Sequence, residues 1–462
     1  MISRDNPGAR SPRTPAYLMM GIFLVALWIA GGASRADAAG QIFAQGAAWL
    51  LLLGFVVWAP LPKLRPFAPI AFILLGCIAL AAAQLVPLPP ALWMSLPGRD
   101  LLAQTAVVTG QEQPWRPLSM SPGATANALA SLIVPTLALV LAVSVLPEEK
   151  WRTATLLLCL VFASAILALL QFSGGNFDHP LINDVPGSVS GSFANRNHLA
   201  LFIAIGCVLA PSWGFRGERS ARWKGPVSIA LLLFFGLIVL ATGSRMGLLL
   251  GALGAAIGLM NVRRELRAVL RRQPRWLGIA VIAGVLVLAA TAVLLSVTLG
   301  RAVSLERAFS LDVAEDLRRQ ALPTVWAMTL EYLPFGAGVG TFDPLYRMHE
   351  PTYLLDVRYF NHAHNDWLEW LLEGGVIAAA LALAAVGWWL WKSFDAWRSS
   401  KPGASLARAG SGILLLTFAA SVTDYPARTP MVAAVAVIAA VWLARGDSQR
   451  PSRNPPTPAA TS

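Results

Sequence analysis

The long apolar segments of this chain constrain its fold more than any other feature. A helix needs about 20 consecutive apolar residues to cross the hydrocarbon core of a bilayer, which is about 30 Å thick. About 12 segments approach this length, and they are apolar on all sides, as expected for helices that face lipid and one another. These predicted spans are residues 17–33, 42–59, 68–87, 125–146, 152–171, 198–213, 226–243, 245–260, 277–299, 367–391, 410–422 and 429–444. The sequence therefore predicts an all-α fold, a polytopic transmembrane helical bundle of about 12 spans.

Composition supports a membrane location. The chain has 462 residues, of which 56% are hydrophobic and only 13% are charged. Soluble domains carry about 25% charged residues, so lipid is the main solvent expected for this chain. Its three cysteines, Cys77, Cys159 and Cys207, lie inside apolar segments. This placement leaves neither a disulfide framework nor a thiolate metal site.

The lysines and arginines predict the orientation of the bundle, because cytoplasmic loops of membrane proteins are enriched in these residues. With the N-terminus in the cytoplasm, every lysine and the arginine cluster between Arg263 and Arg275 lie on the cytoplasmic side. This rule accounts for the net charge of +12 without nucleic acid as a partner. We therefore expect a multi-pass protein of the bacterial inner membrane with both termini in the cytoplasm.

The N-terminal segment has features of a signal peptide, because arginines precede an apolar run that ends near Ala36-Asp37-Ala38. Cleavage there would remove the first helix. Since many further spans follow, we favour a first helix that is retained. Either outcome leaves the orientation of the remaining helices unchanged.

The predicted topology divides the chain into two sets of spans on either side of a large periplasmic loop. The parts are residues 1–299, with spans one to nine and the periplasmic segments 88–124 and 172–197; residues 300–366, the loop; residues 367–444, spans ten to twelve; and residues 445–462, a disordered cytoplasmic tail. Within the loop, residues 310–332 have a helical pattern, and Pro334 to Phe342 form a glycine-rich tight turn. In segment 88–124, Trp93 and Trp115 are expected at headgroup level, as in an interfacial lid.

All five histidines fall in or beside the predicted periplasmic segments, although they played no part in assigning the topology. They are His179, His198, His349, His362 and His364. Their placement on one side of the membrane indicates a periplasmic site.

Two polar motifs border predicted spans. The first, Ser192-Phe193-Ala194-Asn195-Arg196-Asn197-His198, concentrates two amides, a guanidinium and an imidazole, which suits a sugar or phosphate ligand. Its structural alternative is a helix cap with Asn197 at the N-cap position. The second is Thr242-Gly243-Ser244-Arg245. Arg245 either extends its charge to the membrane surface or holds a pyrophosphate with its forked donors, and residue type alone leaves both readings open.

The third motif runs from Asn361 to Gly375 and contains the His-x-His pair of His362 and His364. Such a pair could bind zinc together with a carboxylate, or one histidine could act as a general base. Asp366 and Glu369 resemble a capping box that opens the tenth span, and we expect capping to be their main role.

Together these motifs resemble the O-antigen ligase and O-antigen polymerase superfamily of bacterial membrane glycosyltransferases. The resemblance extends from Gly191 to Gly375. It includes the two motifs above, an arginine-bearing loop helix, the turn Pro-Phe-Gly-x-Gly-x-Gly-x-Phe, and His-x-His-Asn followed by Glu-Gly-Gly. The order of these elements and their placement on one side of the membrane carry the resemblance.

The resemblance implies transfer of glycan from an undecaprenyl-diphosphate donor to a hydroxyl of a glycan, lipid A core or protein acceptor, without a metal or another cofactor. His364 would be the general base, and Arg245 and Arg318 would bind the diphosphate, whose developing charge arginines can stabilise. The residues assigned to substrate binding are Arg196, Asn197, His198, His362, Asn365 and Arg319. Arg319 competes with Arg318 for the same role because the loop helix can be aligned in two ways.

Other assignments remain open at this point. Polymerase and ligase are not distinguished by the chain alone, and we favour polymerase or exopolysaccharide assembly. A transporter of bicarbonate or another small anion would use the same arginines, but it predicts charged side chains near the middle of the bilayer. The predicted spans contain almost none. A zinc hydrolase built on the His-x-His pair is a third possibility.

Overall fold

The computed structural model describes residues 15–174, 179–183, 187–216, 218–270, 313–355, 360–401 and 404–445. The predicted span 277–299, the first residues of the predicted loop and the predicted disordered tail after Arg445 lie outside these ranges.

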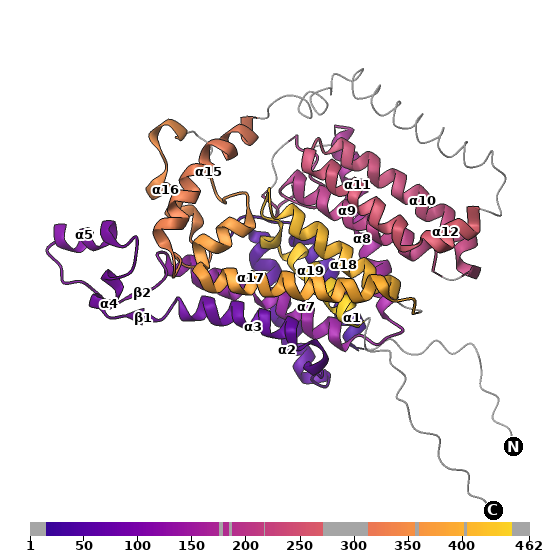
Figure 1. Ribbon diagram of the computed structural model, residues 1–462, viewed down its shortest axis with the longest axis horizontal. Helices are drawn as coiled ribbons and strands as arrows, with labels where there is room; N and C mark the ends of the chain where they lie inside the picture. The colour runs from indigo at the N-terminus through magenta and orange to yellow at the C-terminus, as the bar shows by residue number, and fades with distance from the viewer. Residues whose placement is uncertain are drawn as a thin grey trace, which may run out of the picture.

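The described chain is a bundle of helices with one small sheet (Figure 1). The α-helices are α1 (Pro15–Ala30), α2 (Ala39–Trp58), α3 (Ala68–Ala83), α4 (Pro90–Met94), α5 (Asp100–Val108), α6 (Pro122–Ser131), α7 (Ile133–Ser144), α8 (Lys150–Phe172), α9 (Arg196–Gly214), α10 (Glu218–Ala241), α11 (Arg245–Asn261), α12 (Arg263–Leu270), α15 (Val313–Tyr332), α16 (Phe342–His349), α17 (Asp366–Arg398), α18 (Ala404–Ala420) and α19 (Pro430–Arg445). The 3-10 helices are η1 (Arg65–Phe67), η2 (Thr352–Leu354) and η3 (Pro426–Arg428). Strands β1 (Pro87–Leu88) and β2 (Arg116–Pro117) pair antiparallel, with Pro87 opposite Pro117.

The predicted membrane-protein class is confirmed. Within the described ranges, seven helices are long and apolar enough to cross a membrane. They are Ala39–Trp58, Arg65–Ala83, Pro122–Ser144, Lys150–Phe172, Arg196–Gly214, Trp223–Ala241 and Asp366–Arg398. Four shorter apolar helices, α1, α11, α18 and α19, coincide with the remaining predicted spans that the structure describes. The total of about 12 spans and the periplasmic position of the loop remain predictions.

Helix α9 lies at the centre of the bundle and packs against α8, α10, α11 and α18. Its side chains from His198 to Ser212 are buried, because neighbouring helices cover it on all sides. The first helix is also part of this core, since Met20, Phe23 and Leu24 of α1 are fully buried and α1 contacts α2, α7 and α8. The buried face of α1 thus belongs to the bundle itself.

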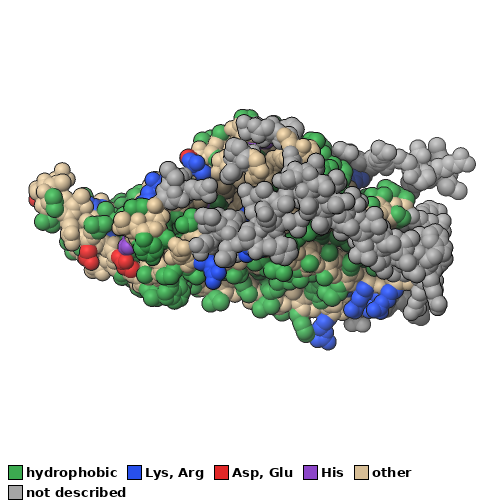
Figure 2. Space-filling model, turned by 90° about the horizontal axis from the view of Figure 1, so that it is seen from above, with side chains coloured by type: hydrophobic (Ala, Val, Ile, Leu, Met, Phe, Trp, Pro, Cys, Tyr) green, Lys and Arg blue, Asp and Glu red, His purple; other side chains and the backbone are tan. Residues whose placement is uncertain are grey.

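Helices α15 and α16 form a smaller hydrophobic cluster with the first turns of α17 (Figure 1). Val325 and Met328 of α15 pack there with Phe342 and Tyr346 of α16 and with Leu372. The hairpin β1–β2 and helices α4 and α5 project beyond this end of the bundle (Figure 1). Figure 2 shows hydrophobic side chains over much of the described surface, with the Asp and Glu side chains of this face toward the end that carries α5.

Trp93, which we expected at the level of the lipid headgroups, is buried within segment 88–124. Trp93 is only 2% exposed, and its Nε1 donates to Pro117 O at 3.0 Å. The guanidinium groups of Arg99 and Arg116 lie 5.7 and 4.9 Å from its ring centroid. Cations gain energy over an indole face, so Trp93 and the two arginines form the small core of segment 88–124. The depth of this segment relative to the lipid headgroups stays a prediction. Trp115, by contrast, is exposed.

The predicted glycine-rich turn is present between α15 and α16, and it packs against a break in α17. Gly336 and Gly375 both have positive φ angles, and a Cβ at Gly375 would lie 2.1 Å from Pro334 O. The Phe342 N–H donates to Glu373 Oε1 at 3.1 Å. The close approach of the two backbones requires glycine at this contact and fixes the position of Glu373.

Candidate active site

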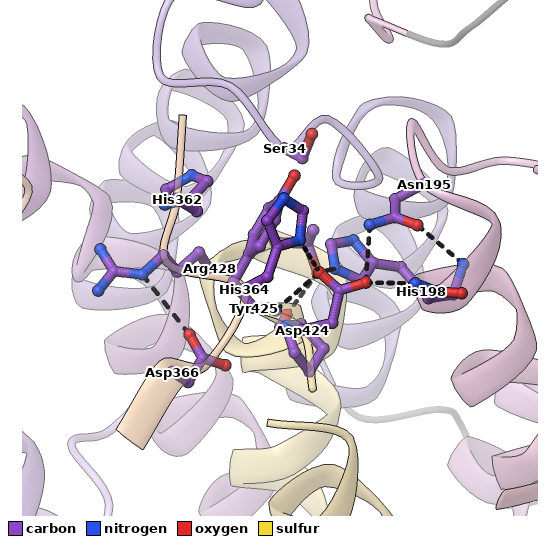
Figure 3. Close-up of polar contacts among 12 residues, drawn as sticks. Ser34, Asn195, His198, His362, His364, Asp366, Asp424, Tyr425 and Arg428 are labelled. Atoms are coloured by element: carbon purple, nitrogen blue, oxygen red, sulfur yellow. Dashed lines mark hydrogen bonds and ion pairs between the residues drawn. The ribbon is translucent and has the colours of Figure 1, made fainter. Parts of the chain in front are cut away.

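The centre of the candidate site is Asp424, in the short loop between α18 and α19 (Figure 3). This carboxylate is buried. Its Oδ1 lies 3.0 Å from His364 Nδ1, and its Oδ2 accepts from Asn195 Nδ2 at 2.9 Å and from Asn197 Nδ2 at 2.6 Å. The carboxylate therefore joins the His-x-His motif to the motif that begins α9.

Helix caps hold the two asparagines in place. Asn195 is the N-cap of α9 and accepts from Asn197 N at 2.8 Å, so the cap is Asn195 and not Asn197 as the alternative reading proposed. Ser244 caps α11 by accepting from Gly247 N, and it donates to Asn197 Oδ1 at 2.7 Å. The ends of α9 and α11 are thus linked to Asp424 through side chains that also cap helices.

The backbone of His364 adopts an unusual conformation. Among the described residues it is the non-glycine residue with positive φ, at 49°. Such a conformation costs about 1–3 kcal/mol and persists only where surrounding contacts enforce it. The hydrogen bond to Asp424 and the ring of Phe360, 5.3 Å away between centroids, supply such contacts. The imidazole is held in a fixed place.

The charges around this pair favour an ionised carboxylate and a neutral imidazole. Burial acts to raise the pKa of Asp424, but the charge of Arg318 and the hydrogen bond with His364 hold it well below its ordinary value. Burial lowers the pKa of His364, and Arg318 lowers it further, against the effect of Asp424. The neutral imidazole therefore donates its Nδ1–H to Asp424, and its Nε2 keeps a lone pair.

A second carboxylate–imidazole pair lies beside the first. His362 Nδ1 is 2.8 Å from Glu369 Oε1, and Ala363 N donates to Glu369 Oε2 at 2.7 Å. Arg428 of η3 reaches Glu373 at 2.9 Å, Glu369 at 3.2 Å and Asp366 at 3.5 Å. We refer to Asp366, Glu369, Glu373, His362 and Arg428 as the Arg428 cluster.

This cluster corrects the predicted capping box. The N-cap of α17 is Asn365, which accepts from Leu368 N at 3.1 Å. Asp366 and Glu369 are buried and bind Arg428 instead of the end of the helix. A buried carboxylate gains more from a guanidinium partner than from a helix end. The capping-box pattern in the sequence therefore did not predict the contacts of Asp366 and Glu369.

Tyr425 separates the two pairs. Its ring centroid lies 4.1 Å from that of His362, 5.0 Å from that of His364 and 5.1 Å from that of His198. Its hydroxyl is hydrogen-bonded to the side chains of Asn361 and Ser34, and burial raises the pKa of Tyr425 to about 12. Tyr425 is thus neutral, and its hydroxyl is held by Ser34 of the loop after α1.

His198 is buried without hydrogen-bond partners for either ring nitrogen among the residues that the structure describes. Its Nε2 lies 3.8 Å from Asp424 Oδ1. A buried imidazole N–H without a hydrogen-bond partner costs about 1–3 kcal/mol.

The described residues contain no group of three or more His, Cys, Asp or Glu side chains placed to hold a metal ion. His362 faces Glu369, whereas His364 faces Asp424, and the ring of Tyr425 packs against both imidazoles. Figure 3 shows the contact of His364 with Asp424. The expectation that the protein works without a metal stays a prediction.

The structure brings several of the predicted residues together. His364, Asn197 and His198 surround Asp424, His362 lies across Tyr425, and Arg318 acts on this group through its charge. The other predicted residues lie on the helices that carry this group or at the ends of those helices. Arg196 and Arg245 begin α9 and α11, Asn365 caps α17, and Arg319 is an exposed residue next to Arg318 on α15.

Sequence reasoning missed Asp424, Tyr425 and Arg428. The available signal was the presence of one acidic and one basic residue in a very short loop between two apolar segments. A charge in such a loop is ordinary at a membrane surface, so the signal alone did not distinguish a site.

Residues 229–383 match the sequence profile of a family described as O-antigen ligase. This match, which covers less than half of the chain, confirms the resemblance drawn from its motifs. The matched region contains Arg245, Arg318 and both residues of the His-x-His pair, whereas Asn195 precedes it and Asp424 follows it. A search of curated proteins found no significant match.

Proposed function

We propose that the protein is a membrane glycosyltransferase of the O-antigen ligase and polymerase type, with His364 as its general base. The observation that carries this proposal is the contact of 3.0 Å between His364 Nδ1 and the buried Asp424 carboxylate. An ionised carboxylate on Nδ1 leaves Nε2 as the proton acceptor, which is the arrangement that activates a hydroxyl nucleophile.

In the proposed reaction, His364 Nε2 takes the proton of the acceptor hydroxyl as its oxygen attacks the anomeric carbon of the donor sugar. The bond from that carbon to the diphosphate oxygen breaks, and the electron pair leaves with the lipid diphosphate. The proton remains on His364 until solvent removes it. Asp424 stabilises the imidazolium formed in this step, at a distance where its charge is effective.

Arginines would neutralise the leaving group. Arg318 is favoured over Arg319, because its charge acts on both His364 and Asp424, whereas the Arg319 side chain is exposed. Arg245 directly follows Ser244, which bonds to Asn197 at the same site. Forked guanidinium donors suit the oxygens of a diphosphate.

The proposed donor is a glycan linked to undecaprenyl diphosphate, and the acceptor is a hydroxyl of a growing glycan, a lipid A core or a protein. Arg196, Asn197, His198, His362 and Asn365 would contribute to substrate binding. We further propose that the site opens to the periplasm from the bacterial inner membrane, with both termini in the cytoplasm, and that no metal takes part. The distribution of lysine and arginine supports this orientation.

A glycan transfer assay tests the proposal. Protein in bilayers would receive a radiolabelled undecaprenyl-diphosphate oligosaccharide and lipid A core or glycan acceptors, with chelator present. His364→Ala should lower transfer at least about 10³-fold, because a general base and its orientation are both lost. His349→Ala should leave transfer unchanged, since His349 contacts Tyr332 and Glu331 instead of the site. Equal transfer by the two variants would refute the role of His364.

The two arginines are compared in the same assay. Arg318→Ala should lower transfer about 10²- to 10³-fold, as expected for loss of a group that stabilises developing charge. Arg319→Ala should change transfer less than about threefold, an effect below 1 kcal/mol. If Arg319→Ala lowered transfer more than Arg318→Ala, the diphosphate-binding role would belong to Arg319.

A further inference from the structure

Helix α15 has an exposed apolar side, although it is not among the candidate spans found in the described ranges. Leu322, Trp326 and Leu330 are each between 48% and 55% exposed. Side chains spaced by four positions lie on one side of a helix, so these three form a continuous row. We refer to them as the α15 row.

The other sides of α15 have different surroundings. Val325 and Met328 face inward and pack in the hydrophobic cluster with α16 and the first turns of α17. Gln320 and Glu331 are exposed and share a polar side that is separate from the α15 row. Protein thus covers one side of the helix and water suits another. The α15 row is an exposed apolar surface, which marks a contact with an apolar partner.

The α15 row leads to a surface that lipid covers in a spanning helix. Phe335, in the turn after α15, is 49% exposed. The preceding Pro334 accepts from the N–H of Val376 in α17 at 3.0 Å. Val376 and Ile377 are 53% and 57% exposed and begin the apolar part of the candidate span Asp366–Arg398. The exposed apolar surface of this span therefore extends through Phe335 towards α15.

Two candidate spans end at the level of this contact. Gln84, which follows the span Arg65–Ala83, donates its Nε2 to Glu373 O at 2.9 Å, close to the break of α17 at Gly375. For two spanning helices, this contact marks the edge of the hydrocarbon core. Helix α15 runs across this end of α17 and not along it (Figure 1). The helix therefore lies at the level where headgroups meet acyl chains.

We propose that α15 is an interfacial helix whose apolar row inserts between the lipids of one leaflet. Such helices bury Leu, Phe and Trp side chains about 5–10 Å into the boundary between headgroups and acyl chains and keep their polar side in water. Trp326 lies at the centre of the row, and indole rings concentrate at this boundary. Arg319 is exposed one turn before Leu322, where its guanidinium can reach lipid phosphates.

Lipid contact along α15 also fixes the height of the candidate site relative to the membrane. Arg318 lies on the same helix, and its charge acts on His364 and Asp424. A helix held between headgroups keeps Arg318 at the level of the phosphates of a lipid-linked substrate. This consequence rests on the proposed function, whereas the lipid contact itself does not.

A spin-label scan of α15 tests the lipid contact. The native Cys77, Cys159 and Cys207 are replaced by alanine, and single labelled cysteines are placed along α15 in vesicles of phosphatidylethanolamine and phosphatidylglycerol. Labels in the α15 row should be more accessible to oxygen, which concentrates in lipid, than to a water-soluble nickel chelate. Labels at Gln320 and Glu331 should show the reverse. A row as accessible to the chelate as these controls would overturn the proposal, and so would a row shielded from both reagents, because protein would then cover it.

Photocrosslinking tests the same contact with the native cysteines in place. Benzoylphenylalanine replaces Trp326 in one protein and Glu331 in the matched control. Light should attach one phospholipid at position 326, read as an increase in mass, and should do so at least about fivefold less at position 331, which faces water. A crosslink from position 326 to another part of the chain or to a second copy, or equal lipid labelling at the two positions, would refute the lipid contact. Neither experiment requires glycan transfer, so this proposal and the proposed function can fail independently.

Discussion

Replacing Asp424 with asparagine should abolish the ability of His364 Nε2 to accept a proton, while the shape of the site stays the same. In the native protein, Oδ2 accepts from two amide groups, those of Asn195 and Asn197. In the D424N protein only the new carbonyl oxygen can accept these bonds. The new NH₂ group must therefore occupy the Oδ1 position and face His364 Nδ1.

This orientation reverses the histidine tautomer. A donor facing Nδ1 requires the lone pair of His364 to lie there, so the proton moves to Nε2 and the base is lost. The corresponding change in a Ser-His-Asp triad lowers kcat about 10⁴-fold. We expect a loss of about 10³- to 10⁴-fold here, which is about 4 to 5.5 kcal/mol in the activation barrier. Raising the pH should not restore the rate.

Glycan transfer by D424N protein, measured beside thermal unfolding, checks this reasoning. Some destabilisation is expected, since the Tyr425 N–H loses its acceptor Oδ1, at a cost of about 1–3 kcal/mol. Asp343→Asn is the matched control, because Asp343 forms an exposed ion pair with Arg347. A folded D424N protein that retains more than about a tenth of the wild-type rate would refute the tautomer argument.

Three further predictions concern pH, the buried charges and close packing. Because burial lowers the pKa of His364, kcat/KM should persist above that pKa and fall on the acid side with a midpoint below about 6.5; a midpoint above 6.5 would contradict this. Arg428→Met should lower the free energy of unfolding by about 3–5 kcal/mol, because it leaves buried carboxylates without a counter-charge, whereas Arg347→Met on the exposed pair should cost at most about 1 kcal/mol; similar losses in chemical denaturation would refute the difference. Gly32→Ala should lower the melting temperature, because its Cβ would lie 1.9 Å from a backbone oxygen, while Gly46→Ala, which has open space, should not; equal melting temperatures would count against the packing described.

The predicted spans agree with helices because the signal for a span is local. An apolar run of sufficient length specifies a helix in lipid whatever its neighbours are. The glycine-rich turn was predicted for the same reason, since Gly336 and its neighbours carry the needed conformations within a few residues. The histidine and asparagine motifs were found because several polar side chains lie together at the end of a span.

The partners of those motifs were not predictable in this way. Asp424 pairs with His364 across 60 positions and with Asn195 across 229 positions of the chain. No feature of the neighbouring sequence distinguishes such a carboxylate from other charged loop residues. Asp366 and Glu369 show the converse problem, because a complete local capping pattern was present while the distant Arg428 determined their actual contacts.

The place of Asp424 in the chain has a consequence for biosynthesis. A ribosome must translate 60 further residues after His364 before this carboxylate exists, since Asp424 lies in the loop between α18 and α19. His364 would therefore enter the membrane without its partner and would become an effective base only when α19 has been inserted. Nascent or prematurely released chains would thus be inert toward the lipid-linked sugars around them.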